Sequence, residues 1–170
     1  MFRLLVLLLG FCAKDAYGGF YDCGSTTDAW TSVKSTELGK YFLMKTTASD
    51  APKCSYAGPL SNRDDGAQTG DYGYGELDAS GKLTKSTAKV KAEGNKIIIT
   101  GAGPLLDGTS IVLHSAYGTC DAVKGPKGDC ELWVRVGNFG VVPFCCTKKF
   151  DECASGKPVK DLSPTSCPTS

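Results

Sequence analysis

The sequence CDAVKGPKGDCELWVRV, residues 120–136, places a short turn next to an apolar run. Its central segment, KGPKGD, is rich in glycine and proline, which favour turns. The run ELWVRV, residues 131–136, predicts a strand. Side chains of a strand alternate between its two faces, so Glu131 and Trp133 are predicted to share one face. Asp121 and Glu131 each directly follow a cysteine at one end of the loop, which makes both acids candidates for a buried site or for its solvated rim.

Strand-like periodicity extends through most of the chain before this stretch. Strands are predicted over residues 40–47, 71–77, 82–93, 95–100 and 109–117. Hydroxyl caps and apolar side chains at near-helical spacing predict a short helix within 26–36, and a charged segment ending at Gly156 predicts another within 147–157. This mainly β pattern with a helix near each end fits both a barrel and a sandwich.

The N-terminus has the layout of a secretory signal peptide over residues 1–18. Arg3 supplies the positive end, residues 4–12 form an apolar core, and Ala-Tyr-Gly at 16–18 resembles a cleavage site. That core is shorter than the roughly 20 apolar residues of a membrane-spanning helix. We therefore expect a secreted, extracellular protein whose residues 19–170 form a single domain.

The cysteine count supports an oxidising compartment. Of the nine cysteines, Cys12 lies in the predicted signal peptide, which leaves eight in the mature chain. An even number in a secreted chain predicts four disulfides and no metal site, although eight cysteines allow 105 pairings.

Charge and motifs exclude several classes of function. Without Arg3, Lys14 and Asp15 the 19 basic and 18 acidic residues become 17 of each, so a nucleic-acid partner is not expected. The charges are scattered, which argues against a membrane surface. A single histidine, His114, and the absence of a nucleophile motif argue against an enzyme. We expect a monomer without a cofactor.

Several fragments, taken in order, resemble the salivary lipocalins of ticks of the histamine- and biogenic-amine-binding, soft-tick type. The fragments are DAW at 28–30, KYFLMKTT at 40–47, CELWV at 130–134, VPFCC at 142–146, FDEC at 150–153 and the terminal Cys167. The resemblance covers essentially the whole mature chain. It implies an eight-stranded antiparallel lipocalin-type barrel with a short N-terminal helix, a C-terminal helix and four disulfides.

The resemblance also implies a disulfide connectivity. The pairs common to the core of the family are Cys54 with Cys167 and Cys120 with Cys146. Two additional pairs seen in some members are Cys23 with Cys145 and Cys130 with Cys153.

Many amine-binding members carry Cys-Asp-aliphatic, a spacer, and then Glu-Leu-Trp or Glu-Leu-Tyr. Here Cys120-Asp121-Ala122 is followed by an eight-residue spacer, residues 123–130, and Glu131-Leu132-Trp133. A buried ammonium requires a compensating anion, and an aromatic face can also bind a cation. We therefore predict Asp121, Glu131 and Trp133 as amine ligands, with Ala122 a departure from the bulkier aliphatic residue.

Weaker candidates for the ligand site are Asp50, Tyr41 and Trp30. Large aromatic residues are more often packing residues, so Trp30 is interpreted first as a plug of the barrel and Tyr41 as core. The same applies to Tyr72 and Tyr74.

The two-site histamine binders carry further acids where this chain has Ala88 and Ile111. Their absence predicts one amine site. The resemblance thus implies a secreted salivary lipocalin that sequesters serotonin, histamine or both, and so suppresses inflammation and haemostasis at a feeding site.

Two alternatives remain open. An eicosanoid such as a leukotriene or thromboxane is an anion that needs a cation inside the barrel, and alternation places Arg135 on the face of Glu131 and Trp133. A complement-inhibiting protein binder would use outer loops such as residues 61–73.

Overall fold

The computed structural model describes residues 22–24, 27–103 and 106–169. The predicted signal peptide, residues 1–18, lies outside the described residues. Within the described ranges, no helix combines the length and apolarity needed to cross a membrane.

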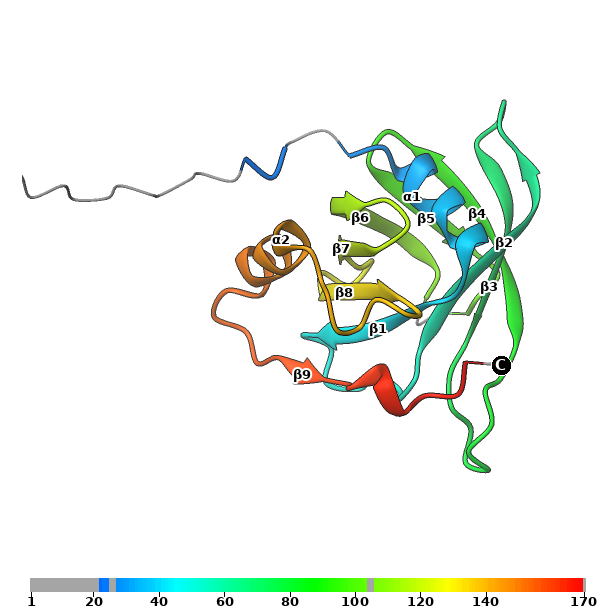
Figure 1. The fold of residues 1–170 in the computed structure, drawn as a ribbon. Helices are drawn as coiled ribbons and strands as arrows, with labels where there is room; N and C mark the ends of the chain where they lie inside the picture. The colour runs from blue at the N-terminus through cyan, green and yellow to red at the C-terminus, as the bar shows by residue number, and fades with distance from the viewer. Residues whose placement is uncertain (1–21, 25–26, 104–105, 170) are drawn as a thin grey trace, which may run out of the picture.

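Eight antiparallel strands form a closed barrel, as the resemblance implies (Figure 1). Neighbours along the chain pair from β2 to β8, β8 pairs with β1, and β1 pairs with β2 to close the barrel. A ninth, two-residue strand extends the sheet from β1. The strands are β1 (Tyr41–Thr46), β2 (Tyr56–Asp64), β3 (Thr69–Gly75), β4 (Ser86–Glu93), β5 (Lys96–Thr100), β6 (Gly108–Ala116), β7 (Cys120–Lys124), β8 (Cys130–Arg135) and β9 (Lys160–Asp161).

Strand β2 is not among the segments that the sequence pattern predicts. It contains Pro59 and Gly58, which usually argue against a strand interior, and its pairing with β3 is interrupted by two register shifts. Residues 61–73, which we expected to form an outer loop, instead belong mostly to β2 and β3. Only residues 65–68 connect the two strands.

Alternation is clearest in β4, where alanine and valine side chains point inward and lysines point to solvent. The strand begins at Ser86, four residues later than predicted, because the preceding segment forms only an isolated bridge between Leu77 and Leu83. Strand β3 begins and ends two residues earlier than predicted.

The helix α1 (Ala29–Ser35) covers one end of the barrel. Asp28 caps it by accepting a hydrogen bond of 2.6 Å from the backbone N–H of Thr31. Trp30 and Val33 pack against Val90 and other inward side chains of the barrel. A one-turn 3₁₀ helix, η1 (Thr36–Leu38), follows directly.

The helix α2 (Phe144–Ala154) packs on the outside of β6, β7 and β8. It begins three residues before the predicted segment, directly after Pro143, because the cysteines and Phe150 form one buried stripe toward the sheet. Phe150 and Cys146 contact Leu132 and Val134 of β8 in a core that lies outside the barrel. A second 3₁₀ turn, η2 (Pro164–Ser166), precedes Cys167.

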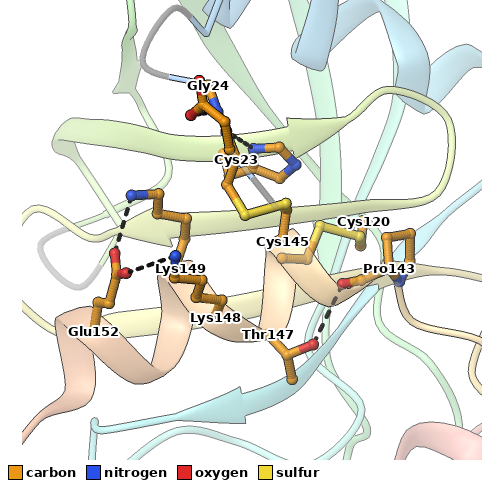
Figure 2. Close-up of a disulfide and its surroundings, with 12 residues drawn as sticks. Cys23, Gly24, Cys120, Pro143, Cys145, Thr147, Lys148, Lys149 and Glu152 are labelled. Carbon is orange, nitrogen blue, oxygen red and sulfur yellow. Dashed lines mark hydrogen bonds and ion pairs between the residues drawn. A yellow bond between two sulfur atoms is a disulfide. The ribbon is translucent and has the colours of Figure 1, made fainter. Parts of the chain in front are cut away.

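Four disulfides link the terminal segments to the barrel or to each other. The pairs are those that the resemblance implies: Cys23–Cys145, Cys54–Cys167, Cys120–Cys146 and Cys130–Cys153. Figure 2 shows Cys23 bonded to Cys145 in the first turn of α2, next to the bridge from Cys120. The adjacent Cys145 and Cys146 thus bond to different segments, which fixes α2 against both the N-terminal segment and β7.

Candidate functional site

The barrel encloses a cavity of about 120 Å³. Asp121 from β7, Glu131 and Trp133 from β8, and Tyr41 from β1 all line it. Among the described lining residues, Asp121 and Glu131 are the only charged side chains.

The two acids lie on neighbouring strands and are displaced along them by one inward-facing position. Asp121 follows the β6–β7 turn, where the Tyr117 hydroxyl accepts a hydrogen bond from the backbone N–H of Asp28 at the start of α1. Glu131 follows the β7–β8 turn, residues 125–129, at the other end. In the register of the two strands Asp121 faces Trp133, and Val123 faces Glu131. Asp121 is therefore at the end closed by α1, and Glu131 is one inward-facing position nearer the β7–β8 turn.

Asp121 is almost completely buried, with 6% of its surface exposed. Its Oδ1 atom has no hydrogen-bond partner among the described residues. Burial raises the pKa of the Asp121 carboxyl to about 6, partly opposed by the hydroxyls of Ser115 and Ser32. An unpaired, buried carboxylate is costly, so a ligand that donates hydrogen bonds to it recovers that cost.

Glu131 has a different environment. Its Oε2 accepts a 2.8 Å hydrogen bond from the indole Nε1 of Trp133. Its Oε1 lies against the β7–β8 turn, where a Cβ atom added to Gly125 would be 3.0 Å away. Burial raises the pKa of Glu131 to about 7; the Trp133 hydrogen bond opposes this rise, and the charge of Asp129 adds to it.

Four tyrosines contribute most of the aromatic wall. They are Tyr41, Tyr56, Tyr72 and Tyr74. Tyr41 shares a 2.9 Å hydrogen bond with Ser35 of α1, and burial raises its pKa to about 12. The hydroxyls of Tyr56 and Tyr74 donate to the backbone carbonyls of Thr84 and Ala102. Burial also raises the pKa of Tyr72, helped by the nearby charge of Asp121.

The remaining lining residues include several that the sequence pattern did not single out. Among them are Ser32, Tyr56, Ile97, Ile99, Ser110 and Val123. Ile97 and Ile99 are two residues apart on one strand, so alternation along the strand could have predicted that they share a face. Ser32 had no such signal, because its position depends on how α1 docks over the end of the barrel.

Two of the weaker candidates do not line the cavity. Asp50 is exposed in the loop after β1, where it faces solvent. Trp30 packs in the core under α1, and its Nε1 donates a 2.9 Å hydrogen bond to Asp65. Its role as a plug of the barrel is therefore the better interpretation.

The structure also shows where Ala88, Ile111 and Arg135 lie relative to the cavity. Ala88 lines the cavity, whereas Ile111 does not; its neighbour Ser110 does. Arg135 is not a lining residue either. Its guanidinium donates to the backbone carbonyl of Leu38 in η1, at 3.4 Å, and Arg135 pairs with Tyr41 at the end of β8.

No Lys or Arg side chain lines the cavity in the part of the chain that the structure describes. The same part contains no group of three or more His, Cys, Asp or Glu side chains arranged to hold a metal ion. The arrangement suits a small cation with an aromatic or apolar body, because two acids and five aromatic rings surround one enclosed volume.

Comparison with known proteins agrees with this geometry. A crystal structure of AM182 in complex with serotonin is 38% identical, with a TM-score of 0.80, and the match covers 87% of this chain and 97% of that one. Apocrustacyanin C1 shares only the fold, at 14% identity and a TM-score of 0.53, over 85% of this chain and 91% of that one. The family model described as tick histamine binding protein matches residues 21–167. The chain therefore belongs to the tick histamine binding protein family, whose members are ligand-binding lipocalins.

Proposed function

We propose that this protein binds one molecule of a biogenic amine, serotonin or histamine, inside the barrel. The observation that carries the proposal is that Asp121 and Glu131 are the only charged side chains among the described lining residues of the cavity. A protonated amine needs a buried anion to offset its lost hydration, and two carboxylates supply it through charge-assisted hydrogen bonds. The serotonin bound to AM182 supports this choice of ligand class.

A single bound amine follows from the same cavity. The lining residues of the described chain include no third acid, since Ala88 and Ser110 occupy inward positions on β4 and β6. An eicosanoid is disfavoured because its carboxylate would lie next to two acids without a lining cation.

We further propose that residues 1–18 are removed as a signal peptide and that residues 19–170 are secreted as one domain. The four disulfides support an oxidising compartment. In tick saliva such a protein would lower the free concentration of host amines and so suppress inflammation and haemostasis.

Calorimetric titration of the secreted protein with serotonin and histamine tests the proposal. The wild type should bind at least one of them, and the double variant Asp121→Asn, Glu131→Gln should lose at least about 100-fold in affinity, since hydrogen bonds to charged groups contribute about 1.5–3 kcal/mol each. Asp50→Asn is the matched control, because Asp50 is an exposed acid outside the cavity. Unchanged affinity in the double variant would show that the two acids do not bind the amine.

A further inference from the structure

We propose that the Cys130–Cys153 disulfide is a site of covalent modification by a small anionic thiol. The thiol attacks Cys153 Sγ and forms a mixed disulfide there, and Cys130 leaves as a thiolate beside the Lys157 ammonium. This disulfide joins β8 to α2 on the outside of the barrel. The inference is therefore independent of which ligand the cavity binds.

The first step is the unequal exposure of the cysteines. Two of the four disulfides bury both of their cysteines: Cys54–Cys167 and Cys120–Cys146. In each of the other two, one cysteine is partly exposed, Cys145 or Cys153, and its partner is buried. Thiol–disulfide exchange needs a thiolate that can reach the attacked sulfur, so attack is directed to these two cysteines. Cys153 also lines a surface groove beside α2.

The second step is the position of Lys157 beside the buried partner of Cys153. Its Nζ donates a 3.0 Å hydrogen bond to the backbone carbonyl of Gly128 and lies 3.8 Å from Cys130 Sγ. Among the described residues, no other cystine sulfur has a hydrogen bond from a charged side chain. A cation beside a cysteine stabilises its thiolate, and a thiol that ionises more readily is expelled faster. Cys130 is therefore a better leaving group than Cys23, which favours exchange at Cys130–Cys153.

The third step is the charge of the groove into which Cys153 opens. Three lysines and two acids line it: Lys124, Lys149, Lys157, Asp22 and Glu152. Glu152 already forms an ion pair with Lys149 at 3.0 Å (Figure 2). No ion pair within the described part of the chain involves Lys124 or Lys157. The excess of positive charge favours the approach of a thiol that carries a carboxylate.

The exchange requires no reagent other than the thiol. The electron pair of the incoming thiolate forms the bond to Cys153 Sγ, and the electron pair of the broken S–S bond leaves on Cys130 Sγ. The first turn of α2 stays attached through Cys145 and Cys146. Attack of the Cys130 thiolate on Cys153 Sγ expels the thiol again, so the modification is reversible.

Mass spectrometry of the folded protein locates the reacting cysteines. The wild type is incubated with 3-mercaptopropionate without denaturant, quenched with N-ethylmaleimide and mapped by peptide. We expect a mercaptopropionate adduct on Cys153 and a maleimide on Cys130 before any other disulfide opens. Earlier opening of Cys23–Cys145, an adduct on Cys130, or no exchange in the folded protein would each refute the proposal.

Variants of Lys157 test the leaving group. Lys157→Gln should slow the exchange by about three- to tenfold, whereas Lys157→Arg, which keeps the charge, should slow it by less than about twofold. Lys148→Gln is the matched control, because it removes the same charge from α2 at a residue that does not line the groove. Equal rates in Lys157→Gln and Lys148→Gln would show that Lys157 does not assist the departure of Cys130.

The choice of thiol tests the charge of the groove. Rates are compared for anionic 3-mercaptopropionate and cationic cysteamine, each corrected for its ionised thiol fraction. The anionic thiol should react at least about threefold faster at low ionic strength, and salt of about 1 M should remove most of the difference, because it screens exposed charges. Equal or faster reaction of cysteamine at low ionic strength would overturn the preference for an anionic thiol.

Discussion

The two faces of the β7–β8 hairpin differ in what they bury: one buries apolar side chains and disulfides, and the other buries two acids. On the face under α2, the side chains of Cys120, Ala122, Cys130, Leu132 and Val134 are at most 1% exposed, and both cysteines form disulfides to the helix. On the face toward the cavity, Asp121 has an oxygen without a hydrogen-bond partner among the described residues, and burial raises the pKa values of Asp121 and Glu131.

The difference shows how one pair of strands can supply stability and binding at once. Alternation sends successive side chains to opposite faces, so the two sets are packed independently. The face under α2 contributes hydrophobic burial and covalent links, whereas the burial of two acids on the cavity face opposes folding. Substitutions on the two faces should therefore change the free energy of unfolding in opposite directions.

The largest effect is expected from Phe150→Ala, which removes a ring that is 1% exposed between α2 and the strands. The free energy of unfolding should fall by about 3–5 kcal/mol, because a large buried side chain and its packing are lost. Urea denaturation with the disulfides intact measures it. Phe144→Ala is the matched control in the same helix, since Phe144 is 58% exposed and should cost clearly less. Amine affinity of the folded Phe150 variant should stay close to wild type; a large loss would mean that the two faces are coupled.

The opposite sign is expected for Asp121→Asn in the ligand-free protein. The folded-state pKa of about 6 lies above the ordinary value of 3.8, so folding opposes ionisation of this carboxyl. That difference corresponds to about 3 kcal/mol at neutral pH, and the variant should regain about 1–3 kcal/mol of unfolding free energy. Urea denaturation without amine measures the gain, and Asp50→Asn should change stability by less than about 0.5 kcal/mol. A destabilised Asp121→Asn variant would indicate that this acid has a structural partner.

The smallest effect is expected for the pH dependence of amine affinity, whereas the pH dependence of stability has a definite sign for both acids. Their pKa values are raised in the folded state, so the stability of the ligand-free protein is highest below the unfolded-state values and is lost as pH rises toward about 6 to 7. Amine affinity should follow the opposite course, falling at least about tenfold between pH 7.5 and pH 5 as Asp121 and Glu131 become protonated. Titration of serotonin across this range measures it. A flat affinity profile in the wild type would contradict binding to ionised Asp121.

Much of the barrel was predictable because its strands keep a clear alternation. The period-2 patterns in β4 and β8 and the cap of α1 follow from local physical chemistry. Strand β2 was not predicted because it contains a glycine and a proline, and because its pairing with β3 includes register shifts that local sequence does not reveal. The family resemblance supplied what local patterns could not, namely the barrel and the disulfide pairs.

The sequence by itself determined which side chains share a face: Glu131 with Trp133, and Leu132 with Val134. It did not determine which face points into the barrel, because α2 covers the outside of β7 and β8 and both faces carry large apolar side chains. Only the closed barrel shows that Asp121 and Glu131 line one cavity. It also shows that Ser110 lines this cavity, whereas Arg135 and Ile111 do not. The physical reason is that alternation fixes relative orientation along a strand, whereas burial depends on which distant segments pack against each side.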